Sequence, residues 1–494
     1  MSLTLTLGLD VGTQGTKGVV LDLHTSAVVA RAARSYDLLP PAQPGAAEQH
    51  PEQWLDAARE VVGELLAHPD VTPSALVALA VSGQQHGLVV LDEHDAVIRP
   101  AKLWCDTSTA RQAAALSERL GRAVPTGFTA SKIAWLAERE PEHWARTRRV
   151  LLPHDYLNFV LTGRACMEAG DASGTGCFDP VTRRFEARAV DAVDPRLAEC
   201  LPELVAPGVL IGEVSAAGAA RLGVPAGLPV ATGSGDNMMS AFGSGATQPG
   251  VAVVSLGTSG TLFAQSAAPV LDPAGLIAPF CDATGAWLPL LCVMNCTGVL
   301  EEVRAAFPGS SHDALSEAAA QVAPGSDGLL MLPYLQGERV PDLPHARGAL
   351  LGLRPGLLRA DRLYRAAMEG VSLNLALGAA RLRALDVPVN SVRVVGGAAR
   401  NALWLQILAD CLDAPVQRLA EAESAALGAA LCAAWSWRRA QGDELSAHEL
   451  ATPCVQLTGE PVRPDVQRVA LYAQLRDEFA SRTEQLFGLT PSAV

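Results

Sequence analysis

Two segments of this chain, separated by roughly half its length, share one pattern: an apolar strand, a glycine-rich turn and a second strand. The first segment covers residues 3–23 and turns at Val11-Gly12-Thr13-Gln14-Gly15-Thr16. The second covers residues 251–263 and turns at Leu256-Gly257-Thr258-Ser259-Gly260. The alternation of apolar residues predicts a β-hairpin in each. A repeat at this spacing predicts an internal duplication with two similar lobes, although two unrelated hairpins would give the same pattern.

The chain length supports two lobes, because 494 residues exceed what one hydrophobic core normally holds. We expect an N-terminal lobe over residues 1–245 and a C-terminal lobe over 246–494, with a helical extension from about residue 446. Strands alternate with helices as far as about residue 245, which predicts an α/β fold. Amphipathic helices are predicted from Pro51 and over residues 361–385. The last predicted helix carries apolar residues at helical spacing: Val469, Tyr472, Leu475, Phe479 and Leu486.

Composition excludes several classes of protein. The net charge of −14 disfavours a nucleic-acid-binding face, which needs clustered basic residues. Apolar runs are broken well before the length of a membrane span, and Met1–Val11 has no basic leader. The ten cysteines show neither CxxC nor zinc spacing. We therefore expect a reduced cytoplasmic protein that binds neither nucleic acid nor membrane.

Common nucleotide and hydrolase motifs are missing. The sequence has no GxxxxGK[ST] loop, no GxGxxG fingerprint, no HExxH and no protein-kinase HRD or DFG motif. A GxSxG-like run at residues 257–261 fails at its last position, which is Thr261. If the protein binds a nucleotide, it must therefore bind the phosphates through another kind of loop.

Three glycine-rich turns are candidates for binding phosphate. Besides the two hairpin tips, Gly396-Gly397-Ala398-Ala399-Arg400-Asn401 follows a buried strand at residues 392–395. Glycine lets backbone N–H groups approach an anion, and Thr13 and Thr258 add hydroxyl donors. We interpret the two hairpin tips as holding the phosphates of one nucleotide and the third turn as holding its base or ribose. Each turn taken singly is equally compatible with ordinary turn chemistry.

Two aspartates follow strands at positions suited to phosphoryl transfer. Asp10 ends the first strand beside its turn, where a carboxylate can hold magnesium directly or through water; capping the hairpin is the alternative. Asp236, in Gly233-Ser234-Gly235-Asp236-Asn237, opens a predicted helix after a strand. We expect it to be ionised and exposed to a cleft, where it could accept a proton from a substrate hydroxyl. A plain helix cap explains the local pattern equally well.

Three further residues are candidate ligands for a polyol or sugar. His86 lies in Ser82-Gly83-Gln84-Gln85-His86-Gly87 at a strand end, among small residues, and could hydrogen-bond a sugar. Trp104 and Asp106 could supply a flat apolar wall and an acceptor. The alternative for all three is a structural role in the core or a turn.

These motifs together resemble the FGGY family of carbohydrate kinases, and within it the xylulokinases, over nearly the whole chain. The likeness rests on ordered matches in both halves: residues 9–13, 82–87, 103–106, 127–132, 151–157, 171–175, 233–237, 255–260, 332–339, 369–371 and 396–401. It implies an actin/hexokinase-like α/β fold with two ribonuclease-H-like lobes and ATP in the cleft between them.

The resemblance also implies roles for single residues. Asp236 would be the general base on the sugar hydroxyl, and Asp10 would orient magnesium. The sugar would contact Gln85, His86, Trp104, Asp236 and Asn237. The nucleotide would contact Thr13, Lys17, Gly257, Thr258, Gly396, Gly397 and Asn401.

The implied reaction is ATP-dependent phosphorylation of a ketopentose, D-xylulose to D-xylulose 5-phosphate. Two departures bear on the sugar: Gln85 stands where xylulokinases usually carry Met, and His154 where they often carry Lys. Ribulose, gluconate, glycerol or a tetritol are alternative substrates. A non-catalytic actin-like nucleotide sensor is a further alternative, and a phosphatase on the same fold is a weaker one. The sequence leaves the oligomeric state open, a homodimer included.

Overall fold

The computed structural model describes residues 3–488, which form two compact units. Unit 1 contains residues 3–247 together with residues 280–287 and 423–455. Unit 2 contains residues 248–279, 288–422 and 456–488. The predicted boundary at 245 lies close to residue 247, where the chain first passes from unit 1 to unit 2. A single boundary does not describe these units, however, because the chain passes between them several times. The predicted C-terminal extension is likewise divided between them.

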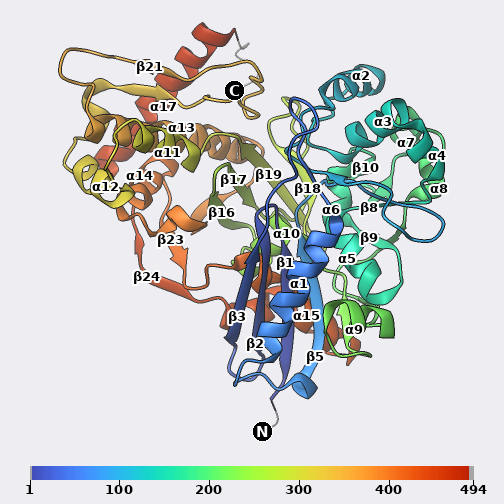
Figure 1. Cartoon of the computed structure of the whole chain (residues 1–494). Coiled ribbons are helices and arrows are strands. Elements are labelled where there is room, and N and C mark those ends of the chain that lie inside the picture. The colour runs from blue at the N-terminus through green and yellow to red at the C-terminus, as the bar shows by residue number, and fades with distance from the viewer. Residues whose placement is uncertain (1–2, 489–494) are drawn as a thin grey trace. The chain divides into compact units, whose positions relative to one another are not determined.

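Each unit is built on a mixed sheet (Figure 1). The sheet of unit 1 has the order β13-β14-β5-β1-β2-β3, with β15 also paired to β5. Its strands are β1 Leu5–Val11, β2 Gly15–Asp22, β3 Ala27–Ser35, β5 Leu76–Gly83, β13 Leu210–Glu213, β14 Pro229–Ala231 and β15 Ser234–Gly235. The second sheet has the order β18-β19-β17-β16-β22-β23-β24. Its strands are β16 Gly250–Leu256, β17 Gly260–Ala264, β18 Ala278–Cys281, β19 Trp287–Val293, β22 Val389–Val395, β23 Val416–Leu419 and β24 Leu457–Val462.

The two sheets repeat one topology. The order β3-β2-β1-β5-β14-β13 in unit 1 corresponds to β19-β17-β16-β22-β23-β24 in unit 2. In each series the first two strand pairings are antiparallel, the next two are parallel, and the last is antiparallel. The internal duplication predicted from the two hairpins is therefore confirmed.

The duplication pairs functional positions as well as strands. Both hairpin turns carry Gly-Thr, and the residue two places before the glycine is Asp10 in the first copy and Ser255 in the second. Only unit 1 therefore has a carboxylate at this point. The strands β5 and β22 occupy equivalent places and lead into the loop with His86 and the turn with Gly396, respectively.

Helices cover both sheets. Those of unit 1 are α1 Pro51–Leu66, α2 Ala110–Leu120, α3 Thr129–Arg139, α4 Pro141–Arg146, α5 Pro153–Thr162, α6 Ala169–Ala172, α7 Ala187–Val193, α8 Leu197–Cys200, α9 Ala216–Leu222, α10 Asp236–Gly243, α15 Ser424–Ala440 and α16 Ala447–Cys454. Those of unit 2 are α11 Thr297–Ala305, α12 His312–Ala320, α13 Ala360–Ala384, α14 Ala402–Leu412 and α17 Val466–Phe487. Short ribbons pair β4 Glu48–Gln49 with β7 Ala101–Lys102, β6 Val89–Leu91 with β8 Arg149–Leu151, β9 Cys166–Glu168 with β12 Glu203–Val205, β10 Phe178–Asp179 with β11 Arg184–Phe185, and β20 Leu330–Leu332 with β21 Ala349–Leu351.

The packing of α15 explains why residues 423–455 belong to unit 1. Register pairs Gly8 with Val19 and Leu9 with Gly18, so the two glycines face opposite sides of the sheet. Helix α1 packs on the side of Gly18, and α15 packs on the side of Gly8. A Cβ atom on Gly8 would lie 2.4 Å from the backbone nitrogen of Ala430, so only glycine admits the helix this close.

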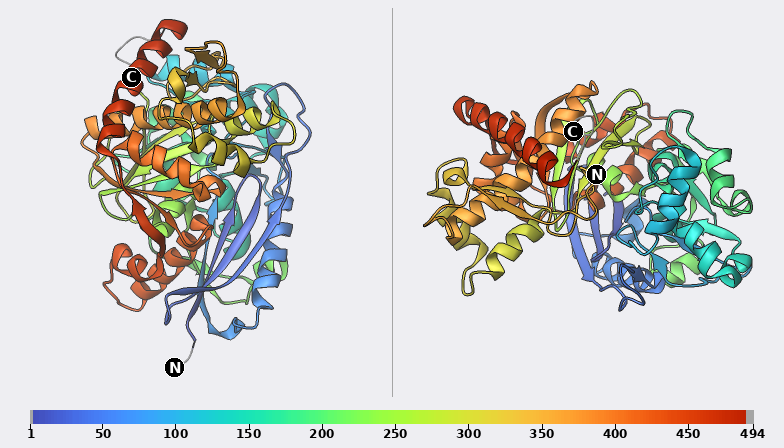
Figure 2. Two further views of the ribbon diagram at one scale, coloured as in Figure 1. Left: turned by 90° about the vertical axis from the view of Figure 1, so that its left-hand side faces the viewer. Right: turned by 90° about the horizontal axis from the view of Figure 1, so that it is seen from above.

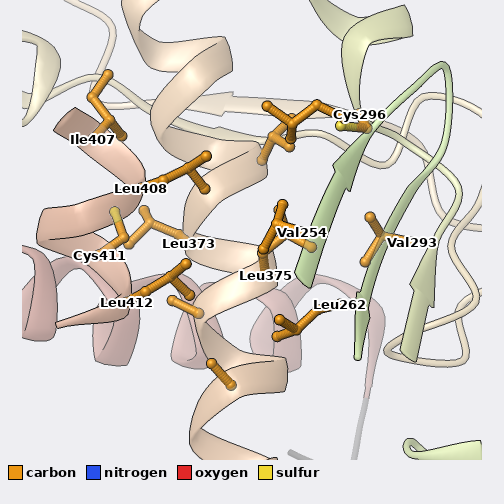
Figure 3. Packing of buried hydrophobic residues seen from close by; sticks show 14 of the residues in the cluster. Val254, Leu262, Val293, Cys296, Leu373, Leu375, Ile407, Leu408, Cys411 and Leu412 are labelled. Carbon is orange, nitrogen blue, oxygen red and sulfur yellow. The ribbon is translucent and has the colours of Figure 1, made fainter. Parts of the chain in front are cut away.

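The core of unit 2 lies between its sheet and α13 and α14. Figure 3 shows Val254, Leu262 and Val293 projecting from β16, β17 and β19 into this core. The helices contribute Leu373, Leu375, Ile407, Leu408 and Leu412. All eight side chains are almost completely buried, so this cluster supplies much of the hydrophobic stabilisation of unit 2.

The last helix, α17, lies beside the orange helices of unit 2 (Figure 2). It buries Tyr472 and Phe479, as its sequence predicts. Leu486 shares the helical spacing of these residues but is 51% exposed. Phe487 packs in the last turn instead, with its ring 5.8 Å from that of Tyr334. Among the helices within residues 3–488, none combines the length and apolarity needed to cross a bilayer.

Candidate active site

Strand pairing places Asp236 next to the loop that follows β5. Ser234 and Gly235 of β15 pair in parallel with Ser82 and Gly83 at the end of β5. Asp236 then begins α10, where the positive end of the helix dipole faces its carboxylate. The sequence predicts this helix start, and the pairing with β5 brings the aspartate to the Gln85–His86 segment.

Asn237 connects the two segments. Its amide Nδ2 donates a hydrogen bond to Oε1 of Gln85 at 2.8 Å and another to Oδ1 of Asp236 at 2.9 Å. Gln85 is 4% exposed, whereas Asp236 and Asn237 remain partly exposed. One oxygen of the Asp236 carboxylate is thus held by Asn237, and the group remains accessible from one side.

The electrostatic state of Asp236 differs from the prediction that it is ionised. Burial by surrounding protein atoms, together with the carboxylates of Asp10 and Asp171, raises its pKa to about 8, although Asn237 acts in the opposite direction. In the ligand-free protein the carboxyl group is therefore largely protonated at pH 7. A raised pKa on a partly exposed carboxyl group beside polar side chains is typical of a catalytic acid or base.

His86 is held in an unusual conformation. Its φ of 66° lies in the left-handed region, which non-glycine residues adopt uncommonly and at some cost in energy. Its ring lies 4.9 Å from that of Phe128 and 5.7 Å from that of Phe280. A Cβ atom on Gly174 would lie 1.9 Å from Nδ1, so only glycine leaves room for the imidazole. The ring orientation is thereby restricted on several sides.

Trp104 lies near this segment, but Asp106 does not serve as predicted. The indole Nε1 of Trp104 donates to the hydroxyl of Thr13 at 2.9 Å, and the side chain is partly exposed. The prediction that Asp106 is a sugar acceptor is wrong. Asp106 is completely buried, and its carboxylate binds Lys102 and Ser108, so it is a structural ion pair.

The hydroxyl of Thr13 is already engaged within unit 1. It donates its one hydrogen to Oε1 of Gln84 at 3.0 Å and accepts the hydrogen bond from Trp104. In this state Thr13 offers a ligand its backbone and not a hydroxyl donor. The side chain instead connects the first hairpin turn to the loop after β5.

Asp10 and Lys17 face each other across the first hairpin. Register pairs them directly, and the hydroxyl of Ser82 donates to Oδ1 of Asp10 at 2.7 Å. Lys17 Nζ forms an ion pair of 2.6 Å with Glu423, the residue before α15. Burial alone would lower the pKa of Lys17, but Glu423 and Asp10 raise it above its usual value. The ammonium group is therefore charged and paired with Glu423, although 44% of the Lys17 side chain is exposed.

The other predicted nucleotide residues lie together in unit 2. Gly257 and Thr258 form the tip of the second hairpin, and the Thr258 side chain is exposed. Gly396 follows β22 directly beside this tip, where its Cβ would lie 2.5 Å from the carbonyl oxygen of Leu256. No protein atom lies within 4 Å of the Cβ position of Gly397, so this face of the turn is open.

Asn401 has a structural position that sequence reasoning did not identify. Its Oδ1 accepts the backbone N–H of Trp404 at 3.1 Å and so caps α14. Its Nδ2 donates to the hydroxyl of Ser316 at 2.8 Å. Both ends of the amide are thus used inside unit 2, and Asn401 shapes the turn rather than presenting its amide outward.

A buried ionic cluster lies behind the Asp236 loop. His154 Nδ1 is 2.6 Å from Oδ2 of Asp171, and His154 Nε2 is 3.4 Å from Oδ1 of Asp155. Ser234, two residues before Asp236, donates to Glu168 at 2.5 Å, and Glu168 accepts the backbone N–H of Asp171 at 2.7 Å. The four ionisable side chains are no more than 1% exposed.

The geometry of this cluster indicates an imidazolium ion. His154, Asp155 and Asp171 are close enough together to ligate a metal, but each ring nitrogen faces a carboxylate, as the two N–H groups of a protonated imidazole would. Burial lowers the pKa of His154, but the surrounding carboxylates outweigh it and raise the pKa to about 9. His154 thus carries a buried positive charge that offsets negative charge on the neighbouring acidic side chains.

Sequence reasoning missed four residues at or beside the site. Phe128 and Phe280 flank His86, Glu423 binds Lys17, and Glu168 supports Ser234. A carboxylate directly before a helix was a usable signal for Glu423. Phe280 lies far from the other residues in the sequence, and no local pattern marks it.

Comparison with known proteins agrees with this arrangement. The models for the N-terminal and C-terminal domains of the FGGY family of carbohydrate kinases match residues 5–243 and 252–437. A xylulose kinase of Haemophilus influenzae is 38% identical over 446 residues, covering 87% of this chain and 90% of that protein. A xylulose kinase of Streptomyces coelicolor is 41% identical over 445 residues and 87% of each chain.

A solved structure extends the similarity to the fold. The crystal structure of xylulose kinase from Rhodospirillum rubrum superposes with a TM-score of 0.85 at 30% identity, covering 98% of this chain and 99% of that one. The expected actin/hexokinase-like fold of two related domains is thereby confirmed. Both family models match, and together they span most of the chain. The chain is a phosphotransferase and belongs to the FGGY family of carbohydrate kinases.

Proposed function

We propose that this protein transfers the γ-phosphate of ATP to D-xylulose and forms D-xylulose 5-phosphate. The support is the identity of 38% and 41% to two xylulose kinases over most of the chain. The observation that carries the chemistry is the carboxyl group of Asp236, which is hydrogen-bonded to Asn237 and accessible at the start of α10.

In this proposal unit 1 binds the sugar. Asn237, Gln85 and His86 supply hydrogen-bonding groups, and the partly exposed ring of Trp104 supplies an apolar surface for the sugar carbons. Gln85 and Asn237 already restrain each other, so little conformational entropy is lost when the sugar binds. The nucleotide is assigned to Gly257, Thr258, Gly396 and Gly397, with Asn401 shaping the last turn.

Asp10 fits a magnesium ligand by its chemistry. Magnesium prefers carboxylate oxygens and water and is usually held by one or two protein carboxylates together with substrate phosphates. Asp10 is partly exposed at the end of β1, and one of its oxygens is fixed by Ser82. Bound magnesium would neutralise charge on the phosphates. The ion pair of Lys17 and Glu423 would lie beside the magnesium, because Lys17 is paired with Asp10 across the hairpin.

The proposed step requires Asp236 as a base. The O–H bond of the sugar breaks, its proton goes to the Asp236 carboxylate, and the sugar oxygen forms a bond to the γ-phosphorus. The bond from that phosphorus to the β–γ bridging oxygen breaks, and ADP leaves. Asn237 holds one carboxylate oxygen, which directs the other toward the hydroxyl group. Exclusion of water favours the sugar as acceptor.

We expect a pH dependence set by Asp236. The base must be ionised, and its pKa in the ligand-free protein is raised to about 8. With the sugar varied and ATP well below saturation, kcat/KM reports the free enzyme. It should therefore rise about tenfold per pH unit below pH 8 and level off above it. A profile that is flat between pH 6 and 8 would contradict this assignment.

The choice of sugar is tested by a panel. ADP release, followed by a coupled assay, is compared for D-xylulose, D-ribulose, gluconate, glycerol and a tetritol under identical conditions. We expect the highest kcat/KM with D-xylulose. A higher value for another sugar would assign that sugar instead. ATP binding without ADP release from any member would favour the sensor alternative.

A further inference from the structure

Phe280 reaches the sugar segment from the second half of the chain. Phe280 lies on β18, which pairs with β19 in the second sheet. Residues 280–287 nevertheless group with unit 1, whereas residues 248–279 and 288–422 belong to unit 2. Phe280 is 2% exposed, and its ring lies 5.7 Å from His86 and 5.9 Å from Phe128. The surroundings of His86 are therefore completed by a segment outside the N-terminal family domain, which ends at residue 243.

This segment is firmly attached to unit 1. The backbone N–H of Cys281 donates to the hydroxyl of Ser173 at 3.0 Å. The indole of Trp287 donates to the carbonyl oxygen of Pro180 at 2.9 Å, and the Arg183 guanidinium lies 4.6 Å from the centre of its ring. The segment is thus anchored at both ends, so the position of the Phe280 ring is fixed rather than incidental.

Phe280 restricts the ring of His86 together with two other groups. Phe128 packs at 4.9 Å, and Gly174 lies directly against the Nδ1 edge of the imidazole. The backbone of His86 is in the left-handed region and would relax if the surrounding structure did not hold it. Aromatic packing of this kind orients a ring without forming a hydrogen bond to it.

We propose that Phe280 is a positioning residue of the sugar site. It holds the imidazole of His86 in the orientation that binds the sugar, so the site assigned to the N-terminal half is complete only with the second half of the chain. The proposal rests on the assignment of His86 to the sugar under the proposed function.

The test replaces Phe280 by Leu, which removes the ring and retains an apolar side chain. With D-xylulose, or with the sugar that the panel turns over fastest, we expect KM and the calorimetric Kd to rise about tenfold, the effect of losing roughly one aromatic contact. The value of kcat at saturating sugar should change less than about twofold. Phe479→Leu is the matched control, since Phe479 is a buried phenylalanine of α17 in unit 2 that packs on Tyr334. It should leave KM unchanged.

A double-mutant cycle separates positioning from stability. In a His86→Ala background, Phe280→Leu should have no further effect on the sugar Kd, because Phe280 acts through His86. An equal effect in both backgrounds, or an unchanged Kd in the wild-type background, would overturn the proposal. If Phe280→Leu does not fold, Phe280→Met, whose flexible side chain adapts to fill gaps in a core, gives the same readout. Absence of turnover by the wild type with every sugar would refute the proposed function, while sugar binding would still test Phe280.

Discussion

Replacing Asp236 by Asn is expected to lower kcat by about 100-fold to 10,000-fold, the range of general-base catalysis. The substitution preserves the shape of the side chain and removes the group that accepts the sugar proton. Asn is well tolerated at the start of a helix. If Asp236 only stabilised the start of α10, this substitution would therefore have little effect. Steady-state ADP release at saturating ATP and sugar measures the change, and calorimetry with a nonhydrolysable ATP analogue measures nucleotide binding.

Two controls sharpen this prediction. Binding of the nucleotide analogue should stay within about threefold, because loss of the proton acceptor affects mainly the transition state. Asp313→Asn changes an exposed aspartate in the first turn of α12 and should leave kcat unchanged. Near-normal turnover by the Asp236→Asn variant would remove this residue from the role of base.

Replacing His154 by Gln is expected to destabilise unit 1 by about 3–5 kcal/mol, because it leaves buried carboxylates without their cation. His154 lies between Asp155 and Asp171, and all three side chains are almost completely buried. The two units need not unfold together, so the readout must be local. Seven of the eight tryptophans lie in unit 1, so tryptophan fluorescence during urea denaturation follows mainly that unit.

The pH dependence gives this prediction a sign. The pKa of His154 is raised from 6.5 to about 9 in the folded protein, so its stabilising effect is fully present below pH 6.5. That effect is lost as the pH rises toward 9 and beyond. The difference in urea midpoint between wild type and His154→Gln should therefore shrink over this interval. A constant difference would contradict a buried imidazolium ion.

Two variants serve as controls for His154. His154→Lys keeps a positive charge and should recover most of the lost stability. His94→Gln changes a largely exposed histidine in the same unit and should leave the urea midpoint unchanged. Equal losses for His154→Lys and His154→Gln would show that packing, and not charge, is what this position requires.

The features that could be predicted from sequence are local or periodic. Apolar residues alternate visibly along the strands of both hairpins. The repetition of this pattern predicted two similar lobes, and the two sheets do match in strand order. Asp236 is recognisable because a strand, a glycine-rich turn and a helix start follow one another within a few residues. The amphipathic pattern from Pro51 likewise became α1, with Trp54 buried.

The features that could not be predicted depend on long-range packing. The ring of Phe280 reaches His86 across nearly two hundred positions of sequence, and α15 enters unit 1 because Gly8 admits it. Asp106 was misassigned although Lys102 stands four residues earlier and pairs with it. The raised pKa of Asp236 comes first from burial and then from the carboxylates of Asp10 and Asp171, and only the fold produces either. The oligomeric state and the cytoplasmic location stay predictions.

The most direct test of the proposed reaction is phosphorus NMR of the wild-type protein with ATP, magnesium and D-xylulose. The proposal predicts that the γ-phosphate resonance of ATP declines while a sugar phosphomonoester resonance grows in equal amount, with ADP as the other product. Formation of ADP and inorganic phosphate without a sugar phosphomonoester would contradict it, because the phosphate would then have passed to water.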